Sequence, residues 1–182
     1  MKGTVLRTIL TLALLGSALT IAGAKSGLPW VKLDANGNIR SFYGIPVTIT
    51  RGGLKRLGFR TRVGYEIYTV AARNHVEVQL TFDRRGRFYR AETTSKNAVG
   101  PRGIRVGSRL SEVRAAWPSG RFSYGCEDGF YVTYTTGTNV LFDFDARDMP
   151  PRARHQCEQL PDSEIPNLKV EAIRIESMAI SW

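Results

Sequence analysis

Residues 64–94 read GYEIYTVAARNHVEVQLTFDRRGRFYRAETT and alternate apolar with polar side chains in three runs. The runs cover 65–71, 75–82 and 87–93, and they are separated by Arg73-Asn74 and by the turn-forming stretch 83–86. Alternation with a period of two is typical of strands that bury one face. The stretch therefore predicts a three-stranded antiparallel meander.

The chain before this meander predicts a hairpin and a short helix. Asn36-Gly37 lies between two strand-like apolar runs, a pattern that favours a tight β-turn. A helix is expected from Thr50 to Leu57, with Thr50 as the N-cap and Gly58 at its end.

The chain after the meander predicts the same kinds of element. A helix capped by Ser108 is expected, because Leu110, Val113 and Trp117 share one face, and Pro118 ends it. Strands are expected at about 129–135 and 138–145, and a last strand at 170–175. A Pro-rich insertion, 147–167, precedes the last strand.

The two halves of the chain resemble each other at an offset of 59 residues. Residues 103–106 (GIRV) correspond to 44–47 (GIPV), and Val113 corresponds to Leu54. We expect an α+β fold with an antiparallel sheet, short helices on one of its faces, and a tandem strand-helix-meander repeat with halves 44–94 and 103–176.

The N-terminal 24 residues have the three parts of a secretory signal peptide. Lys2 and Arg7 precede an apolar run over 9–22, and small residues place the cleavage between Ala24 and Lys25. The apolar run is shorter than the roughly 20 residues of a spanning helix. We therefore expect a periplasmic or extracellular product, 25–182, that forms a single domain and has no transmembrane segment. No cysteine follows the run to accept a lipid.

The chain has two cysteines, Cys126 and Cys157. In an oxidising compartment such a pair is expected to form a disulfide, which would stabilise the fold by roughly 3–4 kcal/mol. A redox role is disfavoured, because acidic residues follow Cys126 and the pair lacks the Cys-x-x-Cys spacing.

Positive charge is concentrated in the first half of the chain. The whole sequence has 26 Lys and Arg against 16 Asp and Glu, a formal net charge of +10. Residues 25–110 hold 17 basic and 5 acidic residues, whereas 111–182 hold 7 and 11. Such a field attracts anions without naming one.

Two basic clusters are candidates for anion binding, because the planar guanidinium group suits phosphate and carboxylate. The alternative is a solvated basic surface that reflects an arginine-rich composition. The candidate residues are Arg51, Lys55, Arg56, Arg60, Arg62, Arg84, Arg85 and Arg87.

One family resemblance rests on Gly103-Ile104-Arg105-Val106-Gly107-Ser108, Glu112-Val113 and the 170–175 strand. Over roughly 60–182 the chain resembles cell-envelope proteins of Gram-negative bacteria that include a sigma-E-regulated lipoprotein of enteric species. The same signature is similar to parts of the β-lactamase-inhibitor fold and of small outer-membrane assembly lipoproteins. The resemblance implies a location in the envelope but no functional residues.

Residues suited to catalysis or metal binding do not form a recognisable pattern. His75 and His155 have no partner at ligand spacing. Asp143 and Asp145 could serve acid-base chemistry or bind Ca²⁺, but the stretch lacks the glycine and glutamate of a calcium loop. We favour a solvated strand face there and expect no catalytic residue, no metal and no cofactor.

Two functional hypotheses follow. The first is a secreted or periplasmic, non-enzymatic envelope protein that binds an anionic surface component or an acidic protein. The alternative is a proteinaceous inhibitor of an extracytoplasmic hydrolase. Nucleic acid is not expected as a partner, because the chain is predicted to be exported.

Overall fold

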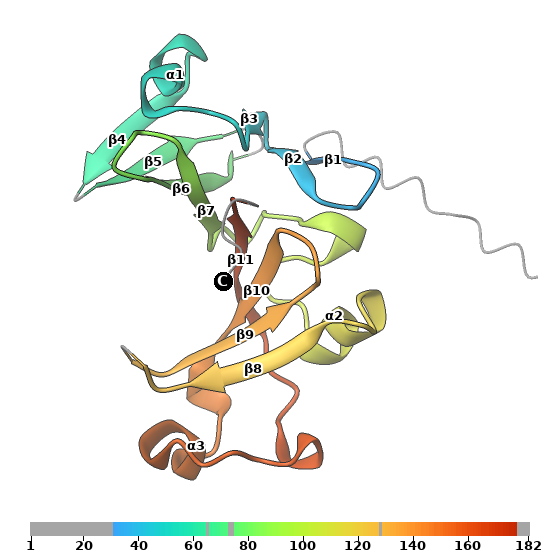
Figure 1. Cartoon of the computed structure of the whole chain (residues 1–182). Coiled ribbons are helices and arrows are strands. Elements are labelled where there is room, and N and C mark those ends of the chain that lie inside the picture. The colour runs from blue at the N-terminus through green and yellow to red at the C-terminus, as the bar shows by residue number, and fades with distance from the viewer. Residues whose placement is uncertain (1–30, 65, 73–74, 128, 178–182) are drawn as a thin grey trace, which may run out of the picture.

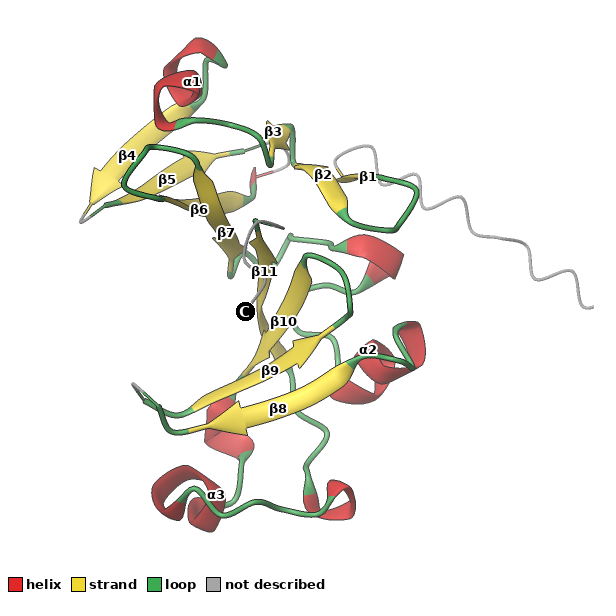
Figure 2. Ribbon diagram, in the orientation of Figure 1, coloured by secondary structure: helices red, strands yellow, loops and turns green. Residues whose placement is uncertain are grey.

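The structure is a computed structural model that describes residues 31–64, 66–72, 75–127 and 129–177. The predicted signal peptide and its cleavage position at Ala24 and Lys25 lie outside the described residues. Two antiparallel sheets, one of three strands and one of eight, dominate the described part (Figures 1 and 2). The described chain is therefore mostly β, with a few short helices.

The three-stranded sheet has the order β1-β2-β3, with bounds Val31–Leu33, Ile39–Phe42 and Ile45–Pro46. The eight-stranded sheet has the order β4-β5-β6-β7-β11-β10-β9-β8. Its strands are β4 (Arg60–Gly64), β5 (Ile67–Ala71), β6 (Glu77–Phe82), β7 (Phe88–Thr93), β8 (Arg121–Gly125), β9 (Tyr131–Thr135), β10 (Val140–Phe144) and β11 (Val170–Glu176). The α-helices are α1 (Arg51–Arg56), α2 (Leu110–Ala116) and α3 (Pro151–Gln156). Short 3-10 turns lie at Pro101–Gly103, Ala146–Asp148 and Asp162–Glu164.

The antiparallel sheet and the short helices α1 and α2 confirm this part of the predicted fold. The predicted meander corresponds to β5, β6 and β7, and the later strands correspond to β9, β10 and β11. The prediction missed β4, β8 and α3. Residues 103–106 also differ from 44–47, because Ile45–Pro46 forms β3 whereas Arg105 makes only an isolated bridge with Val99.

Two four-stranded meanders meet in the middle of the large sheet. Strands β4 to β7 follow one another in space as in sequence, and so do β8 to β11. The meanders are joined where β7 pairs antiparallel with β11, for example at Ala91 and Ile175. Figure 1 shows the first meander and α1 at one end of the molecule and the second meander with α2 and α3 at the other.

One face of the large sheet is apolar and carries helices α1 and α2. Leu80 and Phe142 on this face are fully buried. Near α1, the Arg51 guanidinium lies 5.8 Å from the Tyr68 ring centroid, and next to α2 the ring centroids of Trp117 and Phe142 are 5.2 Å apart. Each large apolar side chain buried here contributes roughly 1.5–3 kcal/mol.

The opposite face, called the polar face below, is defined by one cross-strand row that the pairing register traces through all eight strands. Charged side chains occupy both ends and the middle of this row. The row consists of Arg62, Thr69, Gln79, Glu92, Arg174, Leu141, Thr135 and Arg121.

Helix α2 forms as expected, but its predicted cap is wrong. The N-cap is Arg109, whose backbone N–H donates to the Glu112 carboxylate at 2.6 Å. The Ser108 hydroxyl instead accepts a hydrogen bond from the Arg105 backbone N–H at 3.3 Å. Across the described ranges, no helix has the length and apolar character needed to span a bilayer.

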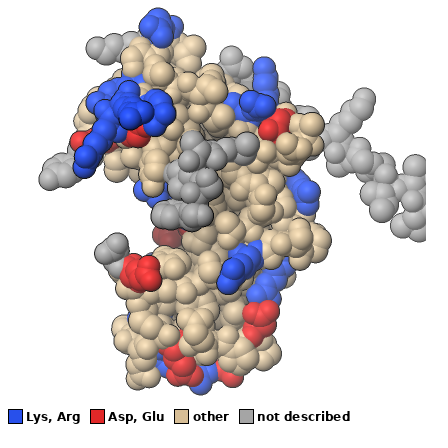
Figure 3. Space-filling model, in the orientation of Figure 1, with Lys and Arg blue, Asp and Glu red and all other residues tan. Residues whose placement is uncertain are grey.

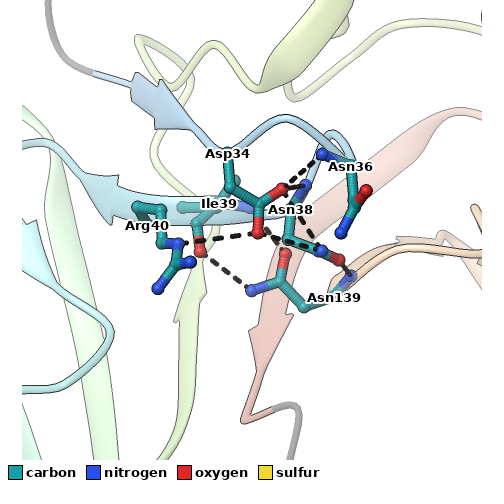
Figure 4. Close-up of polar contacts among 6 residues, drawn as sticks. All are labelled: Asp34, Asn36, Asn38, Ile39, Arg40 and Asn139. Atoms are coloured by element: carbon teal, nitrogen blue, oxygen red, sulfur yellow. Dashed lines mark hydrogen bonds and ion pairs between the residues drawn. The ribbon is translucent and has the colours of Figure 1, made fainter.

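Asn139 joins the two sheets, as Figure 4 shows. Its side-chain oxygen accepts from the Ile39 N–H at 2.7 Å, and its amide nitrogen donates to the Ile39 carbonyl at 3.0 Å. The side chain therefore completes the hydrogen bonding of β2 as a neighbouring strand would. The Asn139 N–H donates in turn to the Asn38 side chain at 3.2 Å. Asp34 receives the Asn38 backbone N–H at 2.9 Å, which lowers the pKa of this carboxyl and fixes the preceding turn.

Gly120 is expected to tolerate no side chain. A Cβ at this position would lie 2.7 Å from both Cζ and Oη of Tyr134, a buried residue whose hydroxyl donates to the Trp117 carbonyl. We expect Gly120→Ala to lower the free energy of unfolding by about 2–3 kcal/mol in urea denaturation. Gly64→Ala is the matched control, since nothing lies within 4 Å of its added Cβ, and a loss as large as that of Gly120→Ala would contradict the argument.

Candidate functional site: the basic end of the sheet

The two predicted basic clusters meet in space at the α1 end of the molecule. The Arg51 backbone N–H donates to the Gly86 carbonyl at 2.9 Å, and Thr50 forms an isolated bridge with Arg87. The N-terminus of α1 therefore lies against the turn between β6 and β7. We call α1, this turn (83–87) and β4 the basic end.

Helix α1 forms despite two glycines because a cap and a buried anchor fix it. The Thr50 hydroxyl accepts the Gly53 N–H at 3.1 Å, so Thr50 acts as the predicted cap. Leu54 is almost fully buried and holds the helix on the sheet. Gly58, with φ of +68°, follows the helix in the left-handed conformation that its predicted role requires.

The turn at 83–87 is held by Asp83. Its Oδ1 atom accepts the backbone N–H groups of Arg85 and Arg87, both at 2.9 Å, and the Arg87 side chain contacts Oδ2 at 2.7 Å. The backbone hydrogen bond from Arg87, followed by its side-chain bond, lowers the pKa of Asp83. The turn thus presents the exposed side chains of Arg84 and Arg85 on a fixed backbone.

The arginines of β4 lie on the other side of the same end. Thr61 and Val63 line a hollow together with Leu54 of α1, so the alternating residues Arg60 and Arg62 belong to the polar face. The structure therefore brings Arg51 beside the 84–87 turn but separates Arg60 and Arg62 from them by the thickness of the sheet. Arg56 is exposed on α1, and the side chain of Lys55 is outside the described set.

The arginines of the basic end are largely unpaired. Among the described candidates only Arg87 has a carboxylate within 4.0 Å. In the other half of the chain each of four arginines pairs with an acidic residue; these are Arg114, Arg147, Arg152 and Arg174. Figure 3 shows basic side chains gathered over the basic end. The positive charge predicted for the first half is thus localised and little neutralised, which is the arrangement that attracts anions.

The predicted disulfide between Cys126 and Cys157 is confirmed, with Cα atoms 6.1 Å apart. It joins the residue after β8 to the residue after α3, far from the basic end (Figure 1). The Tyr124 hydroxyl reinforces this link, because it donates to the Glu158 carbonyl and accepts the Leu160 N–H. The disulfide is therefore a structural crosslink in this fold.

The carboxylates Asp143 and Asp145, considered for acid-base chemistry, have separate roles. Asp143 accepts from the Thr133 hydroxyl at 2.6 Å and pairs with Arg174 at 3.3 Å. Both of these partners line a hollow of the polar face. Asp145 caps the next 3-10 turn, and its side-chain hydrogen bond from Arg147 lowers its pKa to about 2. Arg174, which the sequence analysis missed, could have been found from the alternation within 170–175. No three His, Cys, Asp or Glu side chains of the described ranges converge as metal ligands.

No family model, no curated protein and no solved structure matches the chain. The resemblance to Gram-negative envelope proteins therefore stays a prediction from residues 103–113 and 170–175.

Proposed function

We propose that the protein is an exported, non-enzymatic envelope protein that binds an anionic surface component or an acidic protein through its basic end. The observation that carries this proposal is the gathering of arginines from α1 and the 83–87 turn on one side of this end and from β4 on the other. Among the described residues Asp83 is the single carboxylate that pairs with them. Arginine without an internal partner is free to bind phosphate or carboxylate with its planar fork. The confirmed disulfide supports export, because such bonds persist in oxidising compartments.

Removing two arginines of the turn should weaken binding to anionic probes. For Arg84→Ala/Arg85→Ala we expect a rise in Kd of about 10- to 30-fold, both for phosphatidylglycerol vesicles and for polyglutamate at low salt. Cosedimentation measures the first probe and titration calorimetry the second. Raising the salt to about 0.5 M should abolish binding of the unmodified protein, because exposed charge pairs are screened.

The matched control is Arg105→Ala/Arg121→Ala. Both side chains are exposed and lie away from the basic end. Because two arginines are replaced in each double variant, the control removes the same net charge from another part of the surface. The proposal fails if the two double variants lose affinity equally, or if binding persists unchanged from low to high salt.

We also propose that the two halves, 44–94 and 103–176, arose from one repeated unit. The supporting observation is the order of elements, since each half has a helix followed by a four-stranded meander. Leu54 and Val113, at the predicted offset, are both buried on their helices, and β6 and β10 are both third strands. The mismatch between 44–47 and 103–106 limits the proposed unit to the helix and the meander.

The second candidate function, inhibition of an extracytoplasmic hydrolase, is favoured by the crosslinked segment beside β8. A loop fixed by a disulfide loses little entropy when an enzyme binds it. Inhibition of a co-localised hydrolase by the oxidised protein, lost on reduction, would support this function. Failure with the disulfide intact would count against it.

A further inference from the structure

Strand β4 is a free edge of the eight-stranded sheet. It lies last in the strand order and pairs only with β5. Outside that pairing, no described residue forms a backbone hydrogen bond with β4. Alternate N–H and C=O groups along 60–64 therefore point away from the sheet, where another extended chain could pair with them.

The opposite edge, β8, is less open. All five residues of β4 are exposed, whereas only Arg121 of β8 is. The chain that follows β8 is tied by the Cys126–Cys157 disulfide, and Tyr124 is hydrogen-bonded to the segment at 158–160. The two ends of one sheet thus differ, and β4 is the end that can accept a new strand.

The surroundings of β4 differ on its two faces. On the polar face Arg60 and Arg62 have no carboxylate within ion-pair distance among the described residues. On the α1 face Val63 is 63% exposed beside a hollow of about 420 Å³. This hollow is lined by Arg51, Gly52, Leu54, Thr61, Val63 and Tyr68.

We infer that the basic end takes up an extended segment of a partner protein as a ninth strand along β4. Side chains of a strand alternate between its faces, so acidic residues of the partner would meet Arg60 and Arg62 while its apolar residues enter the hollow beside Val63. This inference rests on the proposed function. It identifies the partner as a polypeptide in which acidic and apolar residues alternate. A solvated polyanion would bind the charged arginines but would contact neither Val63 nor the free backbone groups of β4.

The competing explanation is that Arg60 and Arg62 protect the edge. Charged side chains on edge strands often prevent unwanted pairing between sheets. In that case peptides would bind by charge alone, without backbone pairing. The two explanations differ in what happens to the β4 amides.

The test uses the peptide acetyl-Glu-Val-Glu-Val-Glu-Val-Glu-amide and the same peptide N-methylated at every residue, so that neither of its edges retains the N–H groups of these residues. Both carry equal charge, but the methylated peptide cannot donate those N–H groups to a strand. We expect the unmodified peptide to bind at least about tenfold more tightly and to slow amide hydrogen exchange at 60–64, with no slowing at 121–125. Arg60→Ala/Arg62→Ala should weaken it more than Arg84→Ala/Arg85→Ala does.

Two other outcomes are informative in different ways. Equal, salt-sensitive binding of both peptides without protection of 60–64 overturns strand addition and leaves the proposed function standing. Failure of both peptides, of polyglutamate and of phosphatidylglycerol vesicles to bind at low salt overturns both proposals.

Discussion

Asn139→Ala is expected to lower the free energy of unfolding by about 3–4 kcal/mol, the first of the two largest effects that the structure predicts. The substitution leaves the N–H and the carbonyl of Ile39 without partners, and Ile39 is fully buried. Each buried polar group that loses its hydrogen bond costs about 1–3 kcal/mol. Urea denaturation followed by circular dichroism measures the loss.

The control for this prediction is Asn36→Ala, an exposed asparagine of the neighbouring turn. We expect a change within about 0.5 kcal/mol there. Comparable losses in the two variants would mean that the turn, and not the link between the sheets, accounts for the effect.

The substitution Asn139→Asp is expected to make the free energy of unfolding depend on pH. The introduced carboxylate can accept from the Ile39 N–H but repels the Ile39 carbonyl, which now receives the Asn139 amide at 3.0 Å. Burial beside that carbonyl raises the pKa of the introduced group above its unfolded value of about 4. Stability relative to the unmodified protein should therefore improve as the pH falls from the raised pKa towards about 4, because the protonated group donates again.

Cys126→Ser/Cys157→Ser is expected to lower the free energy of unfolding by about 3–4 kcal/mol. The bond closes a loop with a sequence separation of 31 residues, and the chain-entropy estimate for a loop of this length gives that magnitude. The loss should also appear when a reductant is added to the unmodified protein, since Cys157 lies in an exposed stretch.

Hydrogen exchange locates the effect of losing the disulfide. Without it only the contacts of the Tyr124 hydroxyl hold 158–160. Amides of α3 and of this segment should therefore exchange faster by a larger factor than the core amides of β6 and β7, whose protection falls only with the global stability. Reductant should leave the stability of the double serine variant unchanged. A uniform rise in exchange would contradict a local role.

The sequence predicts the strands that bury one face and little else of the sheet. Alternation in 64–94 finds β5 to β7 because Val78 and Leu80 point into the core and Gln79 does not. Strand β4 has no such signal, since all five of its residues are exposed. Helix α3 was hidden because prolines at its start resemble those of a loop, although proline is well suited to a first helical turn.

The order of the strands and the link through Asn139 could not be predicted. Pairing of β7 with β11 depends on which apolar faces fit together after both meanders form, and alternation is the same for any order. Asn139 lies in a turn where asparagine is common for local reasons, so its bonds to Ile39 leave no trace in the sequence.

For the candidate site, the residue types were predictable and their grouping was not. Arginine clusters at 51–62 and 84–87 are evident in the chain, but the contact between Arg51 and the turn depends on the Thr50–Arg87 bridge and on the hydrogen bond from Arg51 to Gly86. Placement of Arg60 and Arg62 on the polar face follows from their membership of β4, the strand that the sequence did not indicate.

The position of β11 has a consequence for the order in which the large sheet can form. It is the last strand along the described chain, yet it lies between β7 and β10 in the middle of the sheet. Until residues 170–176 are in place, β7 and β10 are both unpaired edges of the large sheet, and the two meanders are not joined. Contacts so distant in sequence form slowly. The sheet therefore stays incomplete until β11 pairs, and until then β7 and β10 expose unpaired edges that a chaperone or rapid pairing with β11 must cover.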